Sequence, residues 1–173
     1  SVLAEARRRQ IAELLADARV PLVEDHALAG LLWGEAPPPI AAYAPDHPVA
    51  VVGSLSKMFW GGLRVGFVRA TEPVALRVAR VKATQDLGSS AISQVLAERL
   101  LTHPGAARFV AGRNAELRGR YEALASALHD RLPDWRWSTP GGGLSLWVRI
   151  PAPVAEPFAQ AAVRQPLLRL VVV

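Results

Sequence analysis

The sequence predicts an α/β fold, and three observations lead to this prediction. Two apolar, β-branched runs, residues 48–54 and 63–70, are typical of strands covered on both faces, as in parallel sheets. A shorter run, residues 20–25, predicts a further buried strand that ends in two acids. Helical or loop segments separate the runs, which is the element order of α/β proteins. With 173 residues, 51% of them hydrophobic, the chain is long enough to bury a core.

The elements before residue 71 alternate between helix and strand. Residues 3–18 predict an amphipathic helix, because apolar side chains recur on one helical face. These side chains are Ile11, Leu14, Leu15 and Ala18. Residues 26–33 predict a second helical segment, and the prolines within residues 34–39 forbid regular structure there.

The pattern turns helical after Thr71. Residues 72–84 and 89–101 each predict a helix, with Gly88 as the break between them and two serines as the cap of the second. Pro104 opens a long helix that reaches about Leu132. Its apolar positions alternate four- and three-residue spacing: Leu117, Tyr121, Leu124 and Leu128.

The last third of the chain predicts a small α+β unit. A turn at residues 139–143 leads into an alternating strand at 144–150, then a short helix at 154–165 and a final strand at 167–173. Since a long helix often connects two domains, we expect residues 1–105 to belong to a large domain. Residues 106–173 then form the linking helix and a small C-terminal α+β domain.

Composition excludes several classes of function. The formal charge of +5 is scattered along the chain, which disfavours a dedicated nucleic-acid binder. Cysteine is absent and the four histidines lack metal-ligand spacing, so no metal site is expected. No apolar run approaches the roughly 20 residues of a membrane span, and a cytoplasmic protein without membrane contact is expected. The first residue is not methionine, and we expect a fragment of a longer protein.

The segment "GSLSKMFWGGLRVGF", residues 53–67, carries the strongest functional signal. Taken alone, Lys57 would be a solvated charge in a loop. It follows Ser54 and Ser56 at the end of a buried strand, where α/β proteins place ligands, and Arg64 adds a guanidinium suited to phosphate. A lysine beside phosphate-binding groups suggests a cofactor with both a phosphate and an aldehyde, and pyridoxal 5'-phosphate (PLP) has both.

PLP also needs a carboxylate to keep its pyridine nitrogen protonated. Asp25 ends the strand at residues 20–25 and precedes Lys57 by one unit of strand, helix and loop. Its position alone favours a helix cap or a first-turn acid. Together with Lys57, the cofactor role becomes the better interpretation.

These motifs resemble a known family. The segments "VPLVEDHALAGL" and "VVGSLSKMFWGGLRVGFVRA" look like the PLP site of fold-type I aminotransferases, and especially of the aminotransferase-like domains of MocR-type regulators in the GntR superfamily. The later segments "KATQDLGSSAISQ" and "TPGGGLSLWVRIP" also resemble that group. The resemblance covers nearly the whole chain in the same order.

The resemblance implies a fold and a set of roles. The fold is part of the PLP-dependent transferase (aspartate aminotransferase-like) large domain with a mostly parallel sheet, followed by a small α+β domain. Lys57 would form the Schiff base, Asp25 would pair with the pyridine nitrogen, and Ser54 and Arg64, with Ser56 as a further candidate, would hold the phosphate. Family members are usually homodimers. In regulators, DNA is contacted by an N-terminal domain that these residues do not include.

Arg169 occupies the region where family members carry an arginine for the substrate carboxylate, and its alternative role is a strand-edge arginine without a ligand.

Three interpretations of the chain stay open. The chain is the effector domain of a MocR-type regulator that senses an amine or amino acid, or an active PLP-dependent aminotransferase acting on an amino acid. The third interpretation is a truncated product that cannot hold PLP alone.

Overall fold

The computed structural model describes residues 2–18, 20–86, 88–151, 158 and 160. They divide into two compact units, Ser1–Gly119 with Pro140–Leu144 and Arg120–Thr139 with Ser145–Val173. Each unit contains a small sheet of its own.

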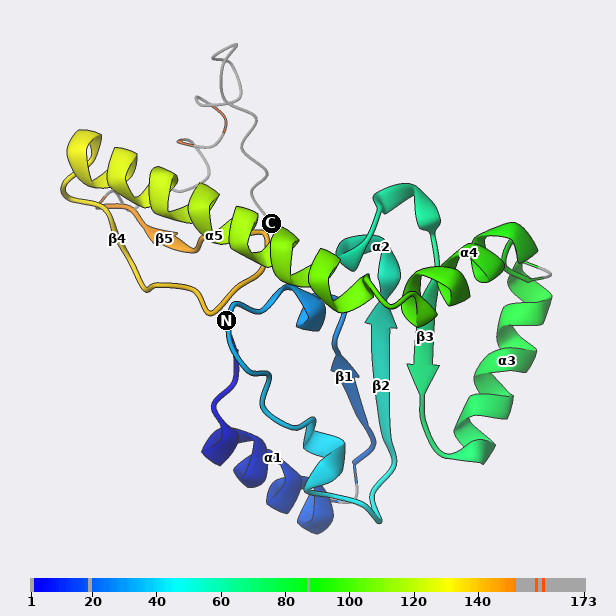
Figure 1. Ribbon diagram of the computed structural model, residues 1–173. Coiled ribbons are helices and arrows are strands. Elements are labelled where there is room, and N and C mark those ends of the chain that lie inside the picture. Colours follow the sequence, from blue (N-terminus) through cyan, green and yellow to red (C-terminus); the bar gives the residue numbers. More distant parts are fainter. Residues whose placement is uncertain (1, 19, 87, 152–157, 159, 161–173) are drawn as a thin grey trace. The chain divides into compact units, whose positions relative to one another are not determined.

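The sheet of the first unit has the order β1-β2-β3 (Figure 1). Its strands are β1 (Leu22–Asp25), β2 (Val49–Ser54) and β3 (Gly66–Arg69). β1 pairs with β2 in parallel, whereas β3 runs antiparallel to β2 and is exposed at all four residues. The three predicted strands are therefore confirmed, but the prediction that the third is a buried parallel strand is wrong, and the described sheet is mixed rather than mostly parallel.

Within the described ranges, five α-helices and three 3₁₀ turns accompany the strands. The helices are α1 (Glu5–Ala18), α2 (Leu55–Met58), α3 (Glu72–Asp86), α4 (Ala91–Thr102) and α5 (Ala106–Arg131). The turns are η1 (Ala29–Leu31), η2 (Ile40–Ala42) and η3 (Gly61–Leu63). The helical turn predicted within residues 26–33 is present as the single 3₁₀ turn η1. The predicted cap of α4 is confirmed, since the Ser90 hydroxyl accepts a hydrogen bond from the Ser93 N–H at 3.3 Å.

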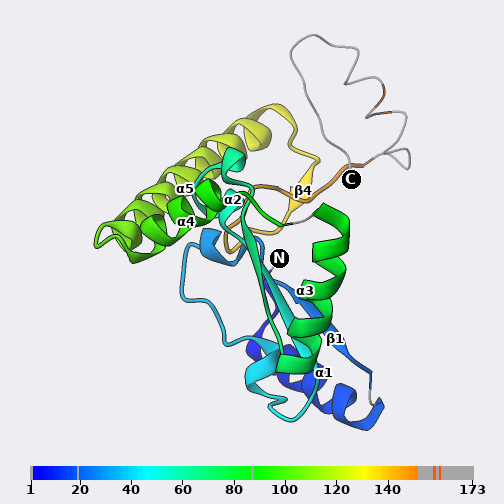
Figure 2. The same ribbon diagram turned by 90° about the vertical axis from the view of Figure 1, so that its right-hand side faces the viewer.

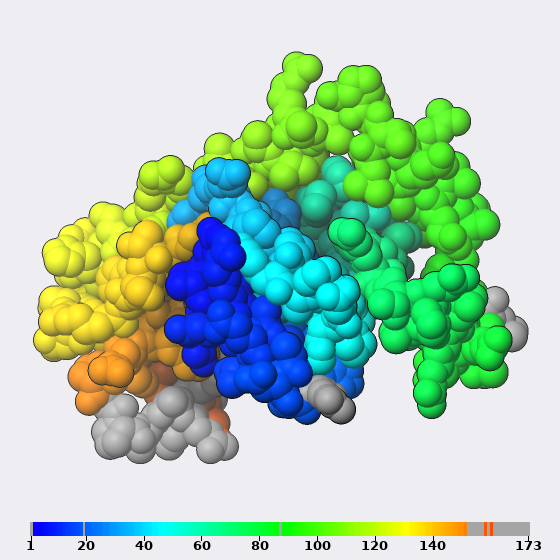
Figure 3. Space-filling view, turned by 90° about the horizontal axis from the view of Figure 1, so that it is seen from below, coloured from blue at the N-terminus to red at the C-terminus, as the bar shows by residue number. Residues whose placement is uncertain are grey.

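A first core cluster holds α1 against one face of the sheet. Ala12 and Leu15 of α1 are buried together with Ile40 and Ala44, and Leu22 of β1 packs against them. Figure 3 shows α1, in dark blue, lying against the cyan segment that contains η2. Ile11 and Leu15 of the predicted apolar face contact this core, whereas Leu14 is 60% exposed and Ala18 is also exposed, so the predicted amphipathic pattern is confirmed only in part.

A second core cluster supports the opposite end of β2. Leu55 of α2 and Phe59, the residue that follows this helix, are buried with Leu63 of η3 and Ala97 of α4. Leu63 is only 1% exposed, and the Leu55 N–H donates to the Val65 carbonyl at 3.0 Å. The segment that contains Lys57 and Arg64 is therefore folded back onto packed apolar side chains. α3, in contrast, stands on the β3 side of the sheet (Figure 2) and buries none of its residues.

The turn at residues 139–143 closes on the segment that follows β1. Leu32 forms a bridge with Gly142, and the Gly143 N–H donates to the Leu31 carbonyl at 2.9 Å. Gly142 has a φ of 145°, and a Cβ built on it would lie 2.3 Å from the Leu31 oxygen. Only glycine fits this close approach.

Gly142→Ala is expected to destabilise the protein by about 1–3 kcal/mol, because it combines an unfavourable φ with a backbone clash. Gly112→Ala is the matched control: Gly112 lies inside α5 with nothing within 4 Å of a built Cβ. This control should instead stabilise by about 0.5–1 kcal/mol. Chemical denaturation measures both, and equal stability of the two variants would contradict the tight contact at Gly142.

The second unit is described more briefly. β4 (Arg136–Trp137) pairs antiparallel with β5 (Val148–Arg149), so the predicted strand at 144–150 is confirmed over two residues. Trp135 meets Phe158 edge to face with ring centroids 5.5 Å apart. The predicted helix at 154–165 lies largely outside the described residues, and the predicted strand at 167–173 lies entirely outside them.

None of the helices in the described part of the chain combines the length and the hydropathy that a membrane span requires.

Candidate functional site

The strand register places four predicted site residues at one edge of the first sheet. Asp25, the last residue of β1, pairs with Val52 of the parallel strand β2. β2 ends at Ser54, which pairs with Gly66 at the start of β3. Lys57 follows Ser54 by one turn of helix, and Arg64 precedes Gly66 by two residues. The carboxyl ends of two parallel strands and the loop after one of them thus meet at one edge, the usual position of ligand sites in α/β sheets.

Lys57 is presented by α2. Leu55 and Phe59, at positions i and i+4 around it, are buried in the second core cluster, so Lys57 lies on the outward side of the helix and is exposed. The lysine was expected in a loop, and the structure places it in this one-turn helix. The chain contains two lysines, Lys57 and Lys82. Lys82 pairs with Asp86 on α3, whereas the Lys57 ammonium has no partner among the described residues.

Asp25 is held in one orientation by the backbone. The Ala27 N–H donates to its Oδ1 at 2.7 Å, and the His26 N–H donates to the Val52 carbonyl at 2.7 Å. The carboxylate remains exposed and forms no ion pair with a described residue. It can therefore accept a further hydrogen bond or pair with a cation.

Arg64 occupies a strained backbone position. Its φ of 53° and ψ of 32° are left-handed, and it is the only non-glycine with a positive φ in the described ranges. A left-handed non-glycine residue costs about 1–2 kcal/mol and often occurs at functional sites. The guanidinium is exposed and has no ion pair with a described residue.

Ser54 and Ser56 complete the predicted set. Both are half-buried, and Ser54 stands at the N-cap of α2, where its hydroxyl accepts no hydrogen bond from the N–H groups of that helix. Their hydroxyls are therefore available to a ligand. Together these groups fit a ligand with three features. The Arg64 guanidinium and the two serine hydroxyls suit an anionic group, and the Lys57 amine suits a carbonyl. The Asp25 carboxylate suits a basic ring atom.

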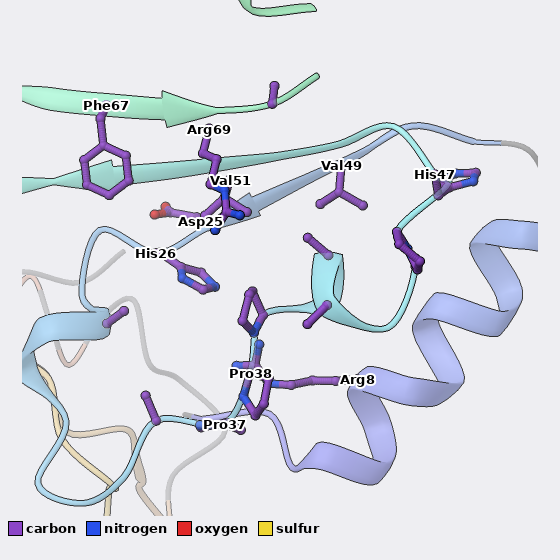
Figure 4. A pocket seen from close by; sticks show the side chains of 18 of the residues that line it. Arg8, Asp25, His26, Pro37, Pro38, His47, Val49, Val51, Phe67 and Arg69 are labelled. Atoms are coloured by element: carbon purple, nitrogen blue, oxygen red, sulfur yellow. The ribbon is translucent and has the colours of Figure 1, made fainter. Parts of the chain in front are cut away.

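A pocket of about 850 Å³ opens on the sheet face beside Asp25 (Figure 4). Val49, Val51 and Phe67 form its strand wall, with Pro37 and Pro38 opposite. Gly53 of β2 leaves the space that the Phe67 ring fills, since a Cβ on Gly53 would lie 2.2 Å from that ring. The pocket includes Asp25 but not Lys57, Ser54, Ser56 or Arg64, so it adjoins the predicted site and does not contain all of it.

A buried ion pair next to Asp25 was missed from sequence. Glu24 is 8% exposed, and its Oε1 lies 2.7 Å from Nη1 of Arg8, which is 11% exposed. Its Oε2 accepts the Ile40 N–H at 2.9 Å. The Nε2 of His26 lies 2.9 Å from Oε1 without hydrogen-bond alignment, so His26 contacts Glu24. One feature of the sequence could have indicated this ion pair: the alternation of side chains along β1 places the acidic Glu24 on the inward face, where a charge needs a partner.

Two further predictions concern residues elsewhere. Arg169 lies outside the described residues, so its proposed role stays a prediction. In the part of the chain that the structure describes, no three His, Asp or Glu side chains gather into a group that could hold a metal ion.

Comparison with known proteins identifies the family. Residues 1–172 match the model of aminotransferase class I and II. The chain belongs to this family. It is also 33% identical over 173 residues to the uncharacterized HTH-type transcriptional regulator YisV of Bacillus subtilis, covering 97% of this chain and 36% of that protein. The regulator YdfD of the same organism is 32% identical, over 86% of this chain and 31% of that protein.

Solved aminotransferases share the fold. LysN, an alpha-aminoadipate aminotransferase of Thermus thermophilus crystallised with N-(5'-phosphopyridoxyl)-L-leucine, superimposes with a TM-score of 0.81 at 27% identity. The match covers 91% of this chain and 42% of that one. The aminotransferase-like fold and the resemblance to HTH-type regulators predicted from sequence are thus confirmed. The chain spans about a third of the length of the two regulators.

Proposed function

We propose that this aminotransferase-family chain is the PLP-binding effector domain of a MocR-type transcriptional regulator, which senses an amine or amino acid. The observation that carries the proposal is the convergence of Asp25, Ser54, Lys57 and Arg64 at one sheet edge, where none of the four side chains forms an ion pair with a described residue and only Asp25 is engaged locally, by the Ala27 N–H. The similarity to YisV along almost the whole chain supports the regulatory context.

Each residue has a role that its chemistry allows. Lys57 is the amine that attaches the cofactor, and Arg64 binds its phosphate, with Ser54 and Ser56 as hydroxyl donors. Asp25 keeps the ring nitrogen protonated through its free carboxylate. When bound, PLP supplies an aldehyde that condenses with a primary amine with loss of one water, so that lysine and ligand amines can exchange without a redox change.

The assembly around this site is also proposed. DNA would be bound by another part of the full-length regulator, and the effector domains would pair as a homodimer, as is usual in the family. Within the chain, we propose residues 1–105 as part of the large domain and residues 106–173 as the linking helix and small domain.

An active aminotransferase is the second candidate, and the likeness to LysN favours it. Both candidates share the cofactor and the site, and they differ in the step after ligand binding. A sensor changes its DNA affinity when the ligand binds, whereas an enzyme releases a keto acid at each turnover.

One experiment on the full-length protein separates them. The protein is titrated with PLP by visible absorbance, and a panel of amino acids is then added. DNA affinity for the upstream region of its own gene and the release of keto acid are measured in parallel. The regulator proposal expects spectral change with altered DNA affinity. Steady release of keto acid at the usual enzymatic rate, on the order of 1–1000 per second, would contradict it.

Asp25→Asn tests the role of the carboxylate. The amide oxygen can still accept the Ala27 N–H, so the turn should persist, but a neutral side chain cannot hold the ring nitrogen protonated. At saturating PLP, we expect spectral exchange with amino acids to continue while any single-turnover release of keto acid slows by roughly a hundredfold or more.

Asp17→Asn, an exposed acid of α1, is the control for the loss of one charge. If wild type releases keto acid and Asp25→Asn releases it at the same rate, Asp25 does not pair with the ring nitrogen.

A further inference from the structure

The end of β1 has little apolar packing to fix its orientation. The strand has four residues, and Val23 and Asp25 point to an exposed face, with Val23 70% exposed. Leu22 and Glu24 face inward, so Glu24 is the last inward-facing side chain of the strand before Asp25. Besides the backbone hydrogen bonds at Asp25 and His26, the contacts of Glu24 are therefore what holds this end of the strand on its inner face.

Three chain segments meet at the Glu24 carboxylate. Arg8 reaches it from α1 at 2.7 Å, the Ile40 N–H reaches it from the start of η2 at 2.9 Å, and His26 lies at 2.9 Å from the same strand end. Figure 4 shows the Arg8 side chain extending from α1 toward the turn that carries Pro38. Both carboxylate oxygens are thus used by partners that come from different elements.

A buried carboxylate is stable only while its partners are in place, because an unpaired charge pays the full desolvation penalty. Loss of the Arg8 contact would therefore favour rotation of Glu24 toward water. Where the backbone of β1 twists to bring Glu24 to water, Asp25 turns with it and away from the Ala27 N–H, because successive strand residues point to opposite faces.

We infer that Glu24 is a positioning residue. With Arg8 as its partner, it fixes the rotation of the end of β1 and so aims the Asp25 carboxylate at the cofactor ring. The predicted effect of Glu24 on PLP affinity rests on the proposed function. The predicted effect of Glu24 on the hydrogen bond between Asp25 and the Ala27 N–H does not depend on the cofactor.

The test is a double-mutant cycle in the full-length protein. Glu24→Gln keeps the shape but removes the charge, and we expect it to weaken PLP binding roughly tenfold. In an Asp25→Asn background, the same change should have no further effect on PLP affinity, because it acts through Asp25. A merely structural role would lower affinity by the same factor in both backgrounds, and that result would overturn the inference, as would unchanged affinity in Glu24→Gln.

Two more variants complete the design. Arg8→Gln breaks the same contact from α1 and should show the same dependence on Asp25, which covers the case in which Glu24→Gln fails to fold. Glu5→Gln is the control, since Glu5 and Arg9 form an exposed ion pair at 2.7 Å on the same helix. The hydrogen bond from Arg9 lowers the pKa of the Glu5 carboxyl, yet its loss should leave PLP affinity unchanged.

Hydrogen exchange of the Ala27 amide gives a readout without cofactor. This amide donates to Asp25, and its exchange should become roughly tenfold faster in Glu24→Gln and in Arg8→Gln but not in Glu5→Gln. A wild-type protein that fails to bind PLP would contradict the proposed function alone. Unchanged exchange at Ala27 in both Glu24→Gln and Arg8→Gln would contradict the positioning role, whatever the protein binds.

Discussion

Lys57→Ala is expected to abolish the visible absorbance that PLP gives when it is attached to the full-length protein, while the free energy of unfolding stays within about 0.5 kcal/mol of wild type. Lys57 is exposed, and its ammonium has no partner among the described residues, so truncating it breaks no hydrogen bond or ion pair within them. The attachment of the cofactor needs a primary amine, which alanine lacks. Absorbance titration and chemical denaturation measure the two effects separately.

Lys82→Ala is the matched control, because Lys82 is the second lysine of this chain and its ion pair within the described residues is with Asp86 on α3. It should keep the absorbance. Loss of absorbance in both variants would point to a general charge effect. Retention in Lys57→Ala would show that another amine carries the cofactor.

Arg64→Gly is expected to change stability and cofactor binding in opposite directions. Glycine adopts the left-handed conformation at residue 64 without the penalty that arginine carries, which should stabilise the fold by about 0.5–1 kcal/mol. Loss of the guanidinium removes a charge-assisted hydrogen bond to phosphate, about 1.5–3 kcal/mol, and so weakens PLP binding roughly tenfold to a hundredfold. Denaturation and PLP titration measure the two quantities.

Arg64→Leu and Arg64→Lys test the chemistry of the same contact. The leucine variant should bind PLP as weakly as the glycine variant, while lysine should restore affinity only in part, because it lacks the planar fork of arginine. If all three variants bind PLP like wild type, Arg64 has a structural role in the η3 turn and does not hold the phosphate.

Helices with a clear periodicity were predictable from sequence. The helix α1 and the serine cap of α4 each have a local cause and appear as expected, although Leu14 and Ala18 of the predicted apolar face of α1 are exposed. The direction and exposure of β3 were not predictable, because its sequence is as apolar as that of a buried strand. Pairing direction depends on the route of the chain between β2 and β3, which here is the short α2–η3 connection.

The site shows the same division between local and tertiary causes. The positions of Asp25, Ser54 and Lys57 beside the carboxyl ends of β1 and β2 were predictable, because each follows an apolar run typical of a strand. The contacts of Glu24 were not predictable, because its partners Arg8 and Ile40 are each sixteen residues away and meet it only in the folded unit. The strain at Arg64 likewise has no signature in the sequence, because left-handed conformations are usually marked by glycine or asparagine.

The most direct test of the proposed site is borohydride reduction of the full-length protein after equilibration with PLP, followed by peptide mapping. Reduction makes an amine-linked cofactor permanent, so the labelled residue can be read from the peptide masses. The proposed function predicts stoichiometric label on the peptide that contains Lys57 and none on the peptide that contains Lys82. A protein that remains unlabelled, or one labelled on Lys82 with Lys57 unmodified, would contradict it.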